Sequence, residues 1–94
     1  MIISFGDKKT LAIWQGKSVK GFNMAIATRA FFKLTIINRA VTVDDLKSPP
    51  ANHLEQLKGN LQGFYSIKIN DQYRIIFKFD DKGASDVEIT DYHK

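Results

Sequence analysis

The sequence predicts an α+β domain in which two N-terminal helices pack on a small antiparallel sheet. Apolar residues in the segment 27–41 recur with the period of a helix, and those of the segment 65–90 alternate with the period of a strand. Between them, Ser48-Pro49-Pro50 is expected to end helical structure, because proline lacks the amide hydrogen that a helix needs. Helices followed by a run of strands indicate a two-layer domain.

Composition limits the class of protein. A chain of 94 residues is long enough for one modest core, so we expect a single domain spanning residues 1–94. No apolar run approaches the roughly 20 residues that span a bilayer, and no secretory signal opens the chain, so no membrane partner is expected. The absence of cysteine fits a reducing cytoplasm. Two histidines without metal-ligand spacing predict neither a metal nor a cofactor.

The first elements are a short strand at residues 2–5 and a short helix after Asp7. Asp7 is a plausible N-cap, and Leu11 and Trp14 would share one helix face before Gly16 ends the helix. A linker of glycine, serine and lysine follows at residues 16–21.

The second helix gives the strongest periodic signal in the chain. Its apolar stripe consists of Ala27, Ala30, Phe31, Leu34, Ile37 and Val41. Arg29, Lys33 and Arg39 lie off this stripe, so we expect them on the exposed face, where they could contact RNA phosphates or simply be solvated. One further helical turn is expected at residues 42–46.

The rest of the chain predicts an antiparallel meander. Strands are expected at 65–69, 73–79 and 86–90, with turns at Asn70-Asp71 and at residues 80–83. The helices would cover the face that carries Tyr73 and its alternate residues. Lys68, Arg74, Lys78 and Tyr92 would then lie on the opposite face, open to solvent or to a ligand.

Charge is divided unevenly along the chain. Residues 1–50 hold eight lysines and arginines against three aspartates, a net +5, and residues 51–94 hold six against seven acidic residues, a net −1. Together they give the formal net charge of +4. A polyanion such as RNA is the natural partner for the basic half, although a solubilising helix surface explains the same pattern.

The residues best suited to chemistry lie at the C-terminus and in two upstream cationic segments. Asp91-Tyr92-His93 would join Lys58 and Arg74 in a metal-free site for a phosphodiester. Cations would neutralise the phosphate, the imidazole of His93 would move protons, Asp91 would orient that imidazole, and Tyr92 would stack on a base. The alternative is that these are solvated residues at a strand end and in an exposed turn.

Several of these segments together resemble a known family. The segments are Ser48-Pro49-Pro50, Leu54-Glu55-Gln56-Leu57-Lys58-Gly59, Gly63-Phe64-Tyr65-Ser66-Ile67, Asn70-Asp71-Gln72-Tyr73-Arg74-Ile75 and the ending Val87-Glu88-Ile89-Thr90-Asp91-Tyr92-His93. Their order and spacing resemble the HigB branch of the RelE-type bacterial toxins, also called the plasmid maintenance killer proteins. The opening residues 1–5 match as well, so the resemblance covers nearly the whole chain.

The resemblance implies a RelE-like two-layer fold and a toxin of a type II toxin–antitoxin system. It implies a ribosome-dependent mRNA endoribonuclease that cuts without a metal by attack of the 2′-OH, and a hetero-oligomer with a helix-turn-helix antitoxin. Carried over by position, the catalytic residues would be Lys58, Arg74, Asp91, Tyr92 and His93. Lys68 and Lys78 would join the three basic residues of the second helix in binding RNA.

This chain departs from the family pattern at one informative position. Glu55 stands where some HigB proteins have a histidine. If that histidine is the proton acceptor, its role here passes to Glu55, passes to His93, or is dispensable. Two other functions stay open on the residues alone: a non-enzymatic gyrase inhibitor resembling the ParE toxins, and a plain RNA-binding module.

Overall fold

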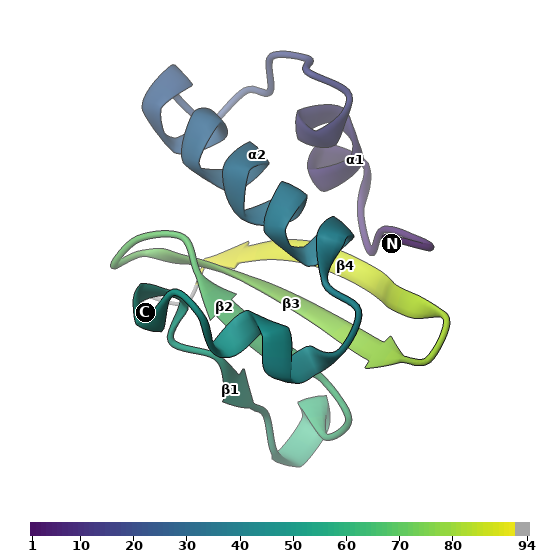
Figure 1. Ribbon diagram of the computed structural model, residues 1–94. Coiled ribbons are helices and arrows are strands. Elements are labelled where there is room, and N and C mark those ends of the chain that lie inside the picture. The colour runs from purple at the N-terminus through teal and green to yellow at the C-terminus, as the bar shows by residue number, and fades with distance from the viewer. Residues whose placement is uncertain (92–94) are drawn as a thin grey trace.

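Two α-helices precede a four-stranded antiparallel sheet, which confirms the predicted combination of elements. The computed structural model describes residues 1–91. Within these residues the sheet has the order β1-β2-β3-β4. The elements are α1 (Lys8–Trp14), α2 (Met24–Arg39), the 3-10 helices η1 (Val43–Lys47), η2 (Pro50–Asn52) and η3 (Gly59–Leu61), and the strands β1 (Glu55–Gln56), β2 (Tyr65–Lys68), β3 (Tyr73–Asp80) and β4 (Gly83–Asp91). Figure 1 shows α1 and α2 together on one side of the sheet, with the teal segment of η1 and η2 between α2 and β1.

Helix α1 begins where the sequence predicts. The Asp7 carboxylate accepts a hydrogen bond from the Thr10 amide at 2.9 Å, which satisfies one of the unpaired donors of the first turn. Of the apolar residues of α1, Ile13 is buried and Leu11 is exposed. Seven residues make only two turns, so a small rotation of the helix changes which side chain meets the sheet.

Helix α2 supplies most of the helical half of the core. Asn23 caps it by accepting from the Ile26 amide at 2.9 Å, and Ala30, Leu34 and Ile37 of the predicted stripe are fully buried. The stripe is shorter than predicted. Phe31 is 43% exposed, and Val41 lies beyond the last helical residue and is 81% exposed.

The segment that follows α2 folds into two 3-10 helices, where one helical turn followed by non-helical chain was expected. The carboxylate of Asp45 accepts from the amides of Val41 and Thr42 at 2.9 and 3.0 Å, which lowers the pKa of Asp45 and begins η1. Helical structure ends before Ser48-Pro49-Pro50 as expected, because η1 stops at Lys47, but a new 3-10 helix, η2, begins at Pro50. Proline is tolerated there because the first residues of a helix donate no intrahelical hydrogen bond.

The sheet follows the predicted alternation, with one strand more than expected. Ile67, Ile75, Phe77, Val87 and Ile89 face the helices and join one buried cluster with α2. Asn70 closes the first turn by accepting from the amides of Gln72 and Tyr73 at 2.9 and 2.7 Å. The two-residue strand β1 pairs antiparallel with β2, opposing Glu55 to Ser66. Its residues do not alternate in polarity, so the pattern gave no signal for it.

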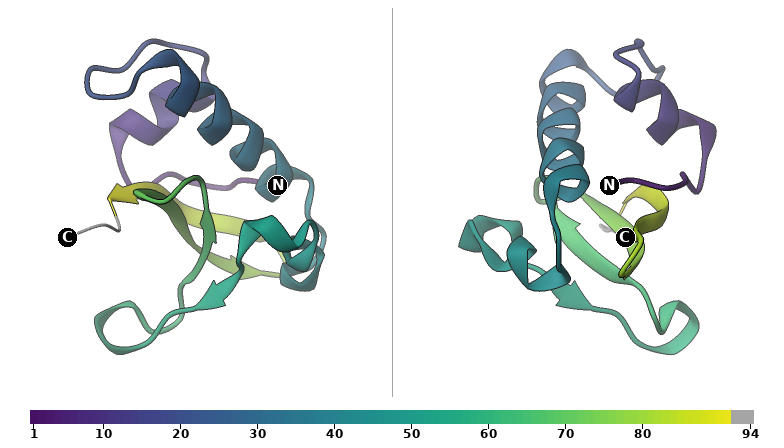
Figure 2. Two further views of the ribbon diagram at one scale, coloured as in Figure 1. Left: turned by 90° about the vertical axis from the view of Figure 1, so that its left-hand side faces the viewer. Right: turned by 45° about the vertical axis from the view of Figure 1, so that its right-hand side comes forward.

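The predicted opening strand lies along β4 as an extended segment. Ile2 and Phe5 form parallel bridges with Ala84 and Val87, and the Ile3 amide donates to the Ala84 carbonyl at 2.6 Å. Figure 2 shows this N-terminal segment running beside the yellow strand β4 below the helices. Neither helix of residues 1–91 has the length and apolar composition needed to cross a membrane.

We expect Gly83→Ala to lower the free energy of unfolding by about 2–4 kcal/mol, because a Cβ there meets two obstacles. Gly83 has φ +131°, and an added Cβ would overlap the Met1 carbonyl of the N-terminal segment. The matched control is Gly63→Ala, whose φ of +95° is strained but whose Cβ would meet no atom within 4 Å. Urea denaturation of both variants measures the difference. Equal losses in the two variants would contradict the packing argument.

Candidate functional site

The candidate site is built on the sheet face that points away from the core cluster. Arg74 of β3 lies opposite Lys68 of β2 and Thr90 of β4. Directly opposed residues in a sheet point to the same side and consecutive residues alternate, so these three side chains share a face. The prediction that Arg74 points away from the helices therefore agrees with the strand register.

Arg74 is buried, contrary to the prediction that it lies open to solvent. It is only 6% exposed. Its Nε donates to the Ser66 hydroxyl at 2.9 Å, and one terminal nitrogen, Nη2, donates to the His53 carbonyl. Alternation along the strand specifies which way a side chain points, and it says nothing about which distant segment lies over it.

The Glu55 carboxylate is an acidic neighbour of this guanidinium among residues 1–91. Its Oε1 lies 3.8 Å from Nη2 of Arg74, and the Glu55 side chain is 50% exposed. A direct charge-assisted hydrogen bond would be about 2.7–2.9 Å long, so this ion pair is loose. One end of the guanidinium is thus held by Ser66 and His53, and a half-exposed carboxylate lies beside it.

Local backbone geometry brings Glu55 to this position. His53 ends η2 in the left-handed conformation, with φ 46° and ψ 56°, so the chain reverses after η2 and enters the short strand β1. Pairing of Glu55 with Ser66 then places the carboxylate on the Arg74 face. The histidine side chain is exposed, and the contact with Arg74 is made by its backbone carbonyl.

Lys58 lies three residues after Glu55 in the loop that leads to η3. It is exposed and lines a cavity of about 440 Å³ together with Gln56, Leu57 and Gln62. The structure therefore places Lys58 on the same short segment as Glu55, beside an open cavity.

The other two predicted cations of the sheet lie further out on the face. Lys68 pairs with Asp71 at 3.0 Å, and its side chain is 34% exposed. Lys78 pairs with Asp86 at 3.6 Å, and its ammonium lies 5.2 Å from the ring centre of Phe64. Both reach solvent, so both can contact a polyanion.

Asp91 does not share the face of Arg74. It is directly opposite Tyr73, and it lines a small cavity with Tyr73, Ile89 and Phe22 on the helix side of the sheet. Its carboxylate accepts from the side-chain amide of Gln72 at 3.2 Å. The remaining predicted site residues, Tyr92 and His93, and the following Lys94 lie outside the described residues.

The three basic residues of α2 have different environments. Arg29 and Arg39 are exposed, as predicted. The prediction that Lys33 is exposed was wrong. Lys33 is 7% exposed, and its Nζ donates to the Asn52 side-chain oxygen at 2.6 Å. Burial lowers the pKa of the Lys33 ammonium, and the nearby charge of Arg29 lowers it further. Such a side chain is poorly placed to contact RNA phosphates.

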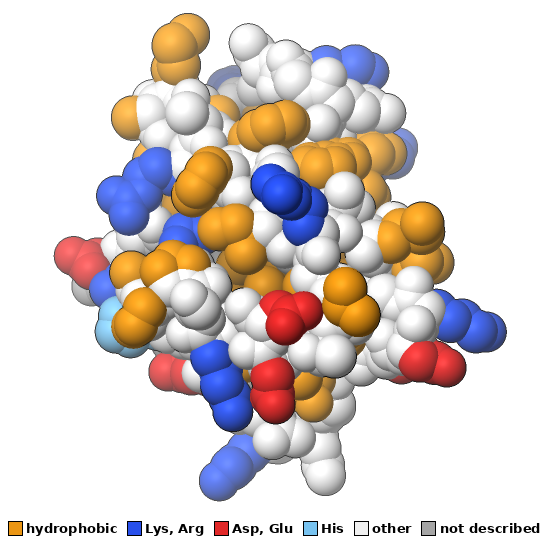
Figure 3. All heavy atoms as spheres, in the orientation of Figure 1, with side chains coloured by type: hydrophobic (Ala, Val, Ile, Leu, Met, Phe, Trp, Pro, Cys, Tyr) orange, Lys and Arg blue, Asp and Glu red, His pale blue; other side chains and the backbone are white. Residues whose placement is uncertain are grey.

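Basic side chains do not gather into one patch on the face seen in Figure 3. Exposed apolar side chains gather over the helical half there, and lysines and arginines are scattered over both halves. This face therefore offers no broad basic surface to a phosphate.

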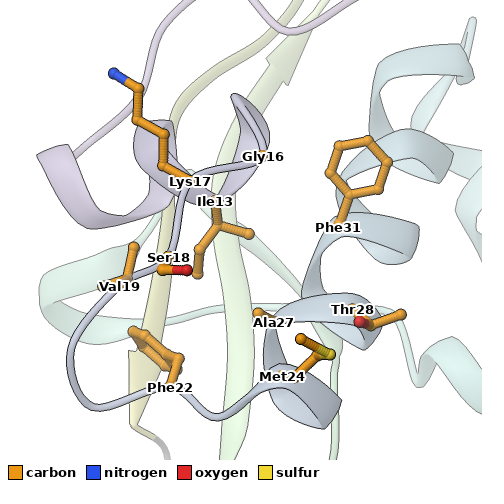
Figure 4. Close-up of a pocket in the computed structure, with 10 residues that line it drawn as sticks. All are labelled: Ile13, Gly16, Lys17, Ser18, Val19, Phe22, Met24, Ala27, Thr28 and Phe31. Carbon is orange, nitrogen blue, oxygen red and sulfur yellow. The ribbon is translucent and has the colours of Figure 1, made fainter.

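A second cavity, of about 520 Å³, lies between α1, the linker after it and α2. Apolar residues such as Ile13, Val19, Phe22 and Phe31 line it, and Figure 4 shows these side chains around the opening between the two helices. Phe31 also stacks on Trp14, with ring centres 5.3 Å apart. The cavity offers no acid–base pair, so its lining does not suit phosphodiester chemistry.

Sequence reasoning missed three members of the site. Ser66, the His53 carbonyl and the side chain of Asn52 were not among the candidates, and Glu55 was considered only as a substitute for a histidine. The signal that could have found Ser66 is its position in β2, out of phase with Tyr65 and Ile67 and therefore on the Arg74 face. The carbonyl and the amide are recognisable only from contacts between segments far apart in the chain.

Comparison with known proteins assigns this chain to a family. Residues 4–93 match the sequence model described as the RelE-like toxin of the type II toxin–antitoxin system HigB. The chain is 43% identical over 95 residues to toxin HigB-1 of Vibrio cholerae serotype O1 (strain ATCC 39315 / El Tor Inaba N16961), and the match covers 100% of this chain and 99% of that protein. An uncharacterized protein of Haemophilus influenzae (strain ATCC 51907 / DSM 11121 / KW20 / Rd) is 42% identical over 55 residues, which are 58% of this chain and 54% of that protein.

Solved structures share the fold. The toxin–antitoxin complex YoeB–YefM from Staphylococcus aureus contains a chain that superposes with a TM-score of 0.64 at 20% identity, covering 100% of this chain and 99% of that one. A heterotetrameric form of the same complex gives 0.64 at 19% identity, with the same coverage. At such low identity the likeness concerns the arrangement of helices and sheet alone.

Proposed function

We propose, from the premise that this chain belongs to the RelE-like HigB toxins of type II toxin–antitoxin systems, that it cleaves messenger RNA on the translating ribosome. Toxins of this family are generally endoribonucleases. Beyond this general activity, we propose the substrate, the dependence on the ribosome and the residues that carry out the reaction.

The observation that carries the proposal is the pairing of Arg74 with Glu55. A buried guanidinium fixed by Ser66 and the His53 carbonyl lies 3.8 Å from a half-exposed carboxylate. A cation and a proton acceptor side by side are the two groups that metal-free cleavage of a phosphodiester needs. A substrate phosphate can compete for the guanidinium because the bond to Glu55 is long.

In the proposed reaction Glu55 takes the proton from the ribose 2′-OH. The 2′-oxygen attacks the adjacent phosphorus, the bond from phosphorus to the 5′-oxygen breaks, and that oxygen takes up a proton. The products are a 2′,3′-cyclic phosphate and a free 5′-hydroxyl. Arg74 stabilises the negative charge that grows on the phosphate oxygens between these steps.

The other predicted residues have supporting roles in this proposal. His93 donates the proton to the leaving 5′-oxygen, and Tyr92 stacks on a base beside the cut. Lys58, three residues from Glu55, contributes charge near the phosphate. Asp91 pairs with Tyr73 of the neighbouring strand β3, so we assign it to holding the end of β4.

RNA binding outside the cut phosphodiester is assigned to exposed cations. Lys68 and Lys78 lie on the sheet face with Arg74, Arg39 is the last residue of α2, and Arg29 lies in the N-terminal half of that helix. Contacts of this kind position a nucleic acid without reading its sequence. Lys33 is left out of this group because it is buried.

The proposed partners are the ribosome with its message and an antitoxin. The family is named for toxin–antitoxin systems, and the matched YoeB structures are complexes with the antitoxin YefM. We propose that this chain forms a hetero-oligomer with a helix-turn-helix antitoxin and acts in the cytoplasm, where its substrate is found.

Mapping of RNA ends on translating ribosomes tests the proposal. Purified toxin added to a translating messenger RNA is expected to produce cuts in phase with codons, each with a cyclic phosphate and a 5′-hydroxyl. The same RNA without ribosomes is expected to stay whole. Absence of cuts in both conditions would exclude an endoribonuclease and favour a gyrase inhibitor or a plain RNA-binding module. An assay of DNA supercoiling by gyrase would then distinguish these two, because only the gyrase inhibitor lowers supercoiling.

A further inference from the structure

A buried chain of polar contacts connects helix α2 to the turn that holds Arg74. It begins at Lys33, whose Nζ donates to Oδ1 of Asn52 across a sequence separation of 19 residues. Lys33 is 7% exposed and Asn52 is fully buried. An ammonium is costly to bury unless a partner replaces its water, and the Asn52 oxygen is that partner.

The amide of Asn52 holds the other side of the same segment. Its Nδ2 donates to the Leu46 carbonyl at 3.1 Å and to the Ser48 carbonyl at 3.3 Å. One side chain therefore ties the end of η1 and the start of the proline segment to η2. With Lys33 bound to its oxygen, the hydrogen-bonding capacity of the amide is used on both sides.

The next residue is the one that contacts Arg74. His53 adopts the left-handed conformation directly after Asn52, and its carbonyl accepts from Nη2 of Arg74. The direction of that carbonyl depends on where η2 ends, and η2 is fixed at Asn52. A shift of the turn would move both the His53 carbonyl and Glu55, which is two residues further along the chain.

We propose that Lys33 and Asn52 are positioning residues for Arg74, holding the turn at residues 52–55 so that the guanidinium and the Glu55 carboxylate keep their relative placement. The catalytic consequence rests on the function proposed above, and the structural link between Lys33 and Arg74 does not. Neither residue contacts the RNA. Their effect reaches the reaction through the His53 carbonyl and Glu55.

The side-chain Nε–H of Arg74 gives a direct readout, measured by nitrogen-15 NMR. The chain has three arginines, and Arg29 and Arg39 are exposed, so only the Nε–H of Arg74 is expected to be protected by burial and by its bond to Ser66. The variant Lys33→Met keeps the length of the side chain and removes the donor. We expect the Arg74 signal to shift and its hydrogen exchange to become about ten-fold faster, the size of one lost hydrogen bond to a charged group.

Lys47→Met is the matched control. It makes the same substitution in η1, where the Lys47 side chain is 68% exposed and pairs only weakly with Asp44 at 3.4 Å. The Arg74 signal should stay at its wild-type position in this variant. An unchanged Arg74 signal in folded Lys33→Met would overturn the inference.

A second variant covers the case in which Lys33→Met does not fold because the Asn52 oxygen is left unpaired. Lys33→Met/Asn52→Leu replaces both partners of this bond with apolar groups, and it also removes the two bonds from Asn52 to the Leu46 and Ser48 carbonyls. The same shift of the Arg74 signal is expected, and a wild-type signal in this double variant would count against the inference. In the wild-type protein, the Asn52 side-chain amide and the Arg74 Nε–H are expected to exchange their hydrogens through one shared opening of the structure, with equal opening free energies. Different opening free energies for the two groups would contradict the structural connection between Asn52 and Arg74.

Cleavage kinetics test the catalytic consequence separately. In Lys33→Met, kcat should fall about ten-fold while KM for the ribosome stays constant, because Lys33 does not contact the substrate. A wild-type kcat together with a displaced Arg74 signal would overturn the positioning role. Should the wild-type protein cut no RNA, the proposed function fails, and the NMR comparison still decides whether Lys33 and Asn52 hold Arg74.

Discussion

Arg74→Lys is expected to lower the rate of mRNA cleavage by about 10²–10³-fold, the usual loss when one preorganised donor to a developing anion is removed. Lysine keeps the positive charge, yet it cannot donate to Ser66, to the His53 carbonyl and to a phosphate in the fixed geometry of a guanidinium. Single-turnover cleavage of a message on stalled ribosomes measures the effect. The loss should appear in kcat more than in KM, because the charge stabilised by Arg74 grows only during the reaction.

The burial of Arg74 decides how this experiment is designed. Arg74→Ala would remove the buried donor to the Ser66 hydroxyl and to the His53 carbonyl. It is therefore expected to lower stability as well as activity. The lysine variant is expected to lose less stability, and thermal denaturation measures that loss.

Ser66→Ala is a milder member of the series, expected to lower cleavage about ten-fold by freeing one end of the guanidinium. Lys82→Ala, in the exposed turn between β3 and β4, should cleave at the wild-type rate.

A wild-type rate in folded Arg74→Lys would remove Arg74 from the reaction. The buried arginine would then be a structural residue that ties β2 and β3 to the turn at His53, and the proposed site would lose its cation.

Glu55→Gln is expected to lower cleavage by about 10²–10⁴-fold, the range for losing a general base. Glutamine has the size and shape of glutamate and still accepts a hydrogen bond, but it cannot take the proton of the 2′-OH. The pH–rate profile adds a second readout, because the limb that reports deprotonation of the base should disappear in the variant. The loose contact to Arg74 makes a large change in stability unexpected, since the Glu55 side chain is 50% exposed.

The matched control for this experiment is Asp44→Asn, which makes the same carboxylate-to-amide change. The Asp44 side chain is 75% exposed in η1 and pairs only with Lys47 within the described residues, so its loss should leave cleavage unchanged. His93→Gln, measured in parallel, separates the two candidates for the base. If Glu55→Gln keeps the wild-type rate and the pH limb disappears in His93→Gln, the base is the histidine and the role proposed for Glu55 is wrong.

Arg74 combines a structural and a chemical role in one side chain. A cation held by fixed partners does not have to reorganise when charge develops next to it, and this is the condition under which electrostatic stabilisation is most effective. Within residues 1–91, partners of Arg74 come from β2, from the end of η2 and from β1. A change in any of these parts can therefore alter the reaction without contacting the substrate.

Local sequence patterns predicted the two α-helices and the three longer strands of this protein. Asp7 as an N-cap, the buried series Ala30, Leu34 and Ile37, and the turns at residues 70–71 and 80–83 all depend on neighbours a few residues apart. The same alternation correctly placed Arg74 on the face away from the helices. Periodicity is sufficient for such predictions because it follows from the geometry of a single helix or strand.

Only the tertiary structure decided what lies over each face. Lys33 sits off the apolar stripe of α2 and is nevertheless buried, because Asn52, 19 residues away, meets its ammonium. Arg74 points away from the core and is nevertheless enclosed, because the turn at His53, 21 residues away, reaches its guanidinium. Glu55 lies in a strand too short to alternate and gains its position from pairing with Ser66. Burial and pairing of this kind depend on which remote segments meet, and no local pattern encodes that.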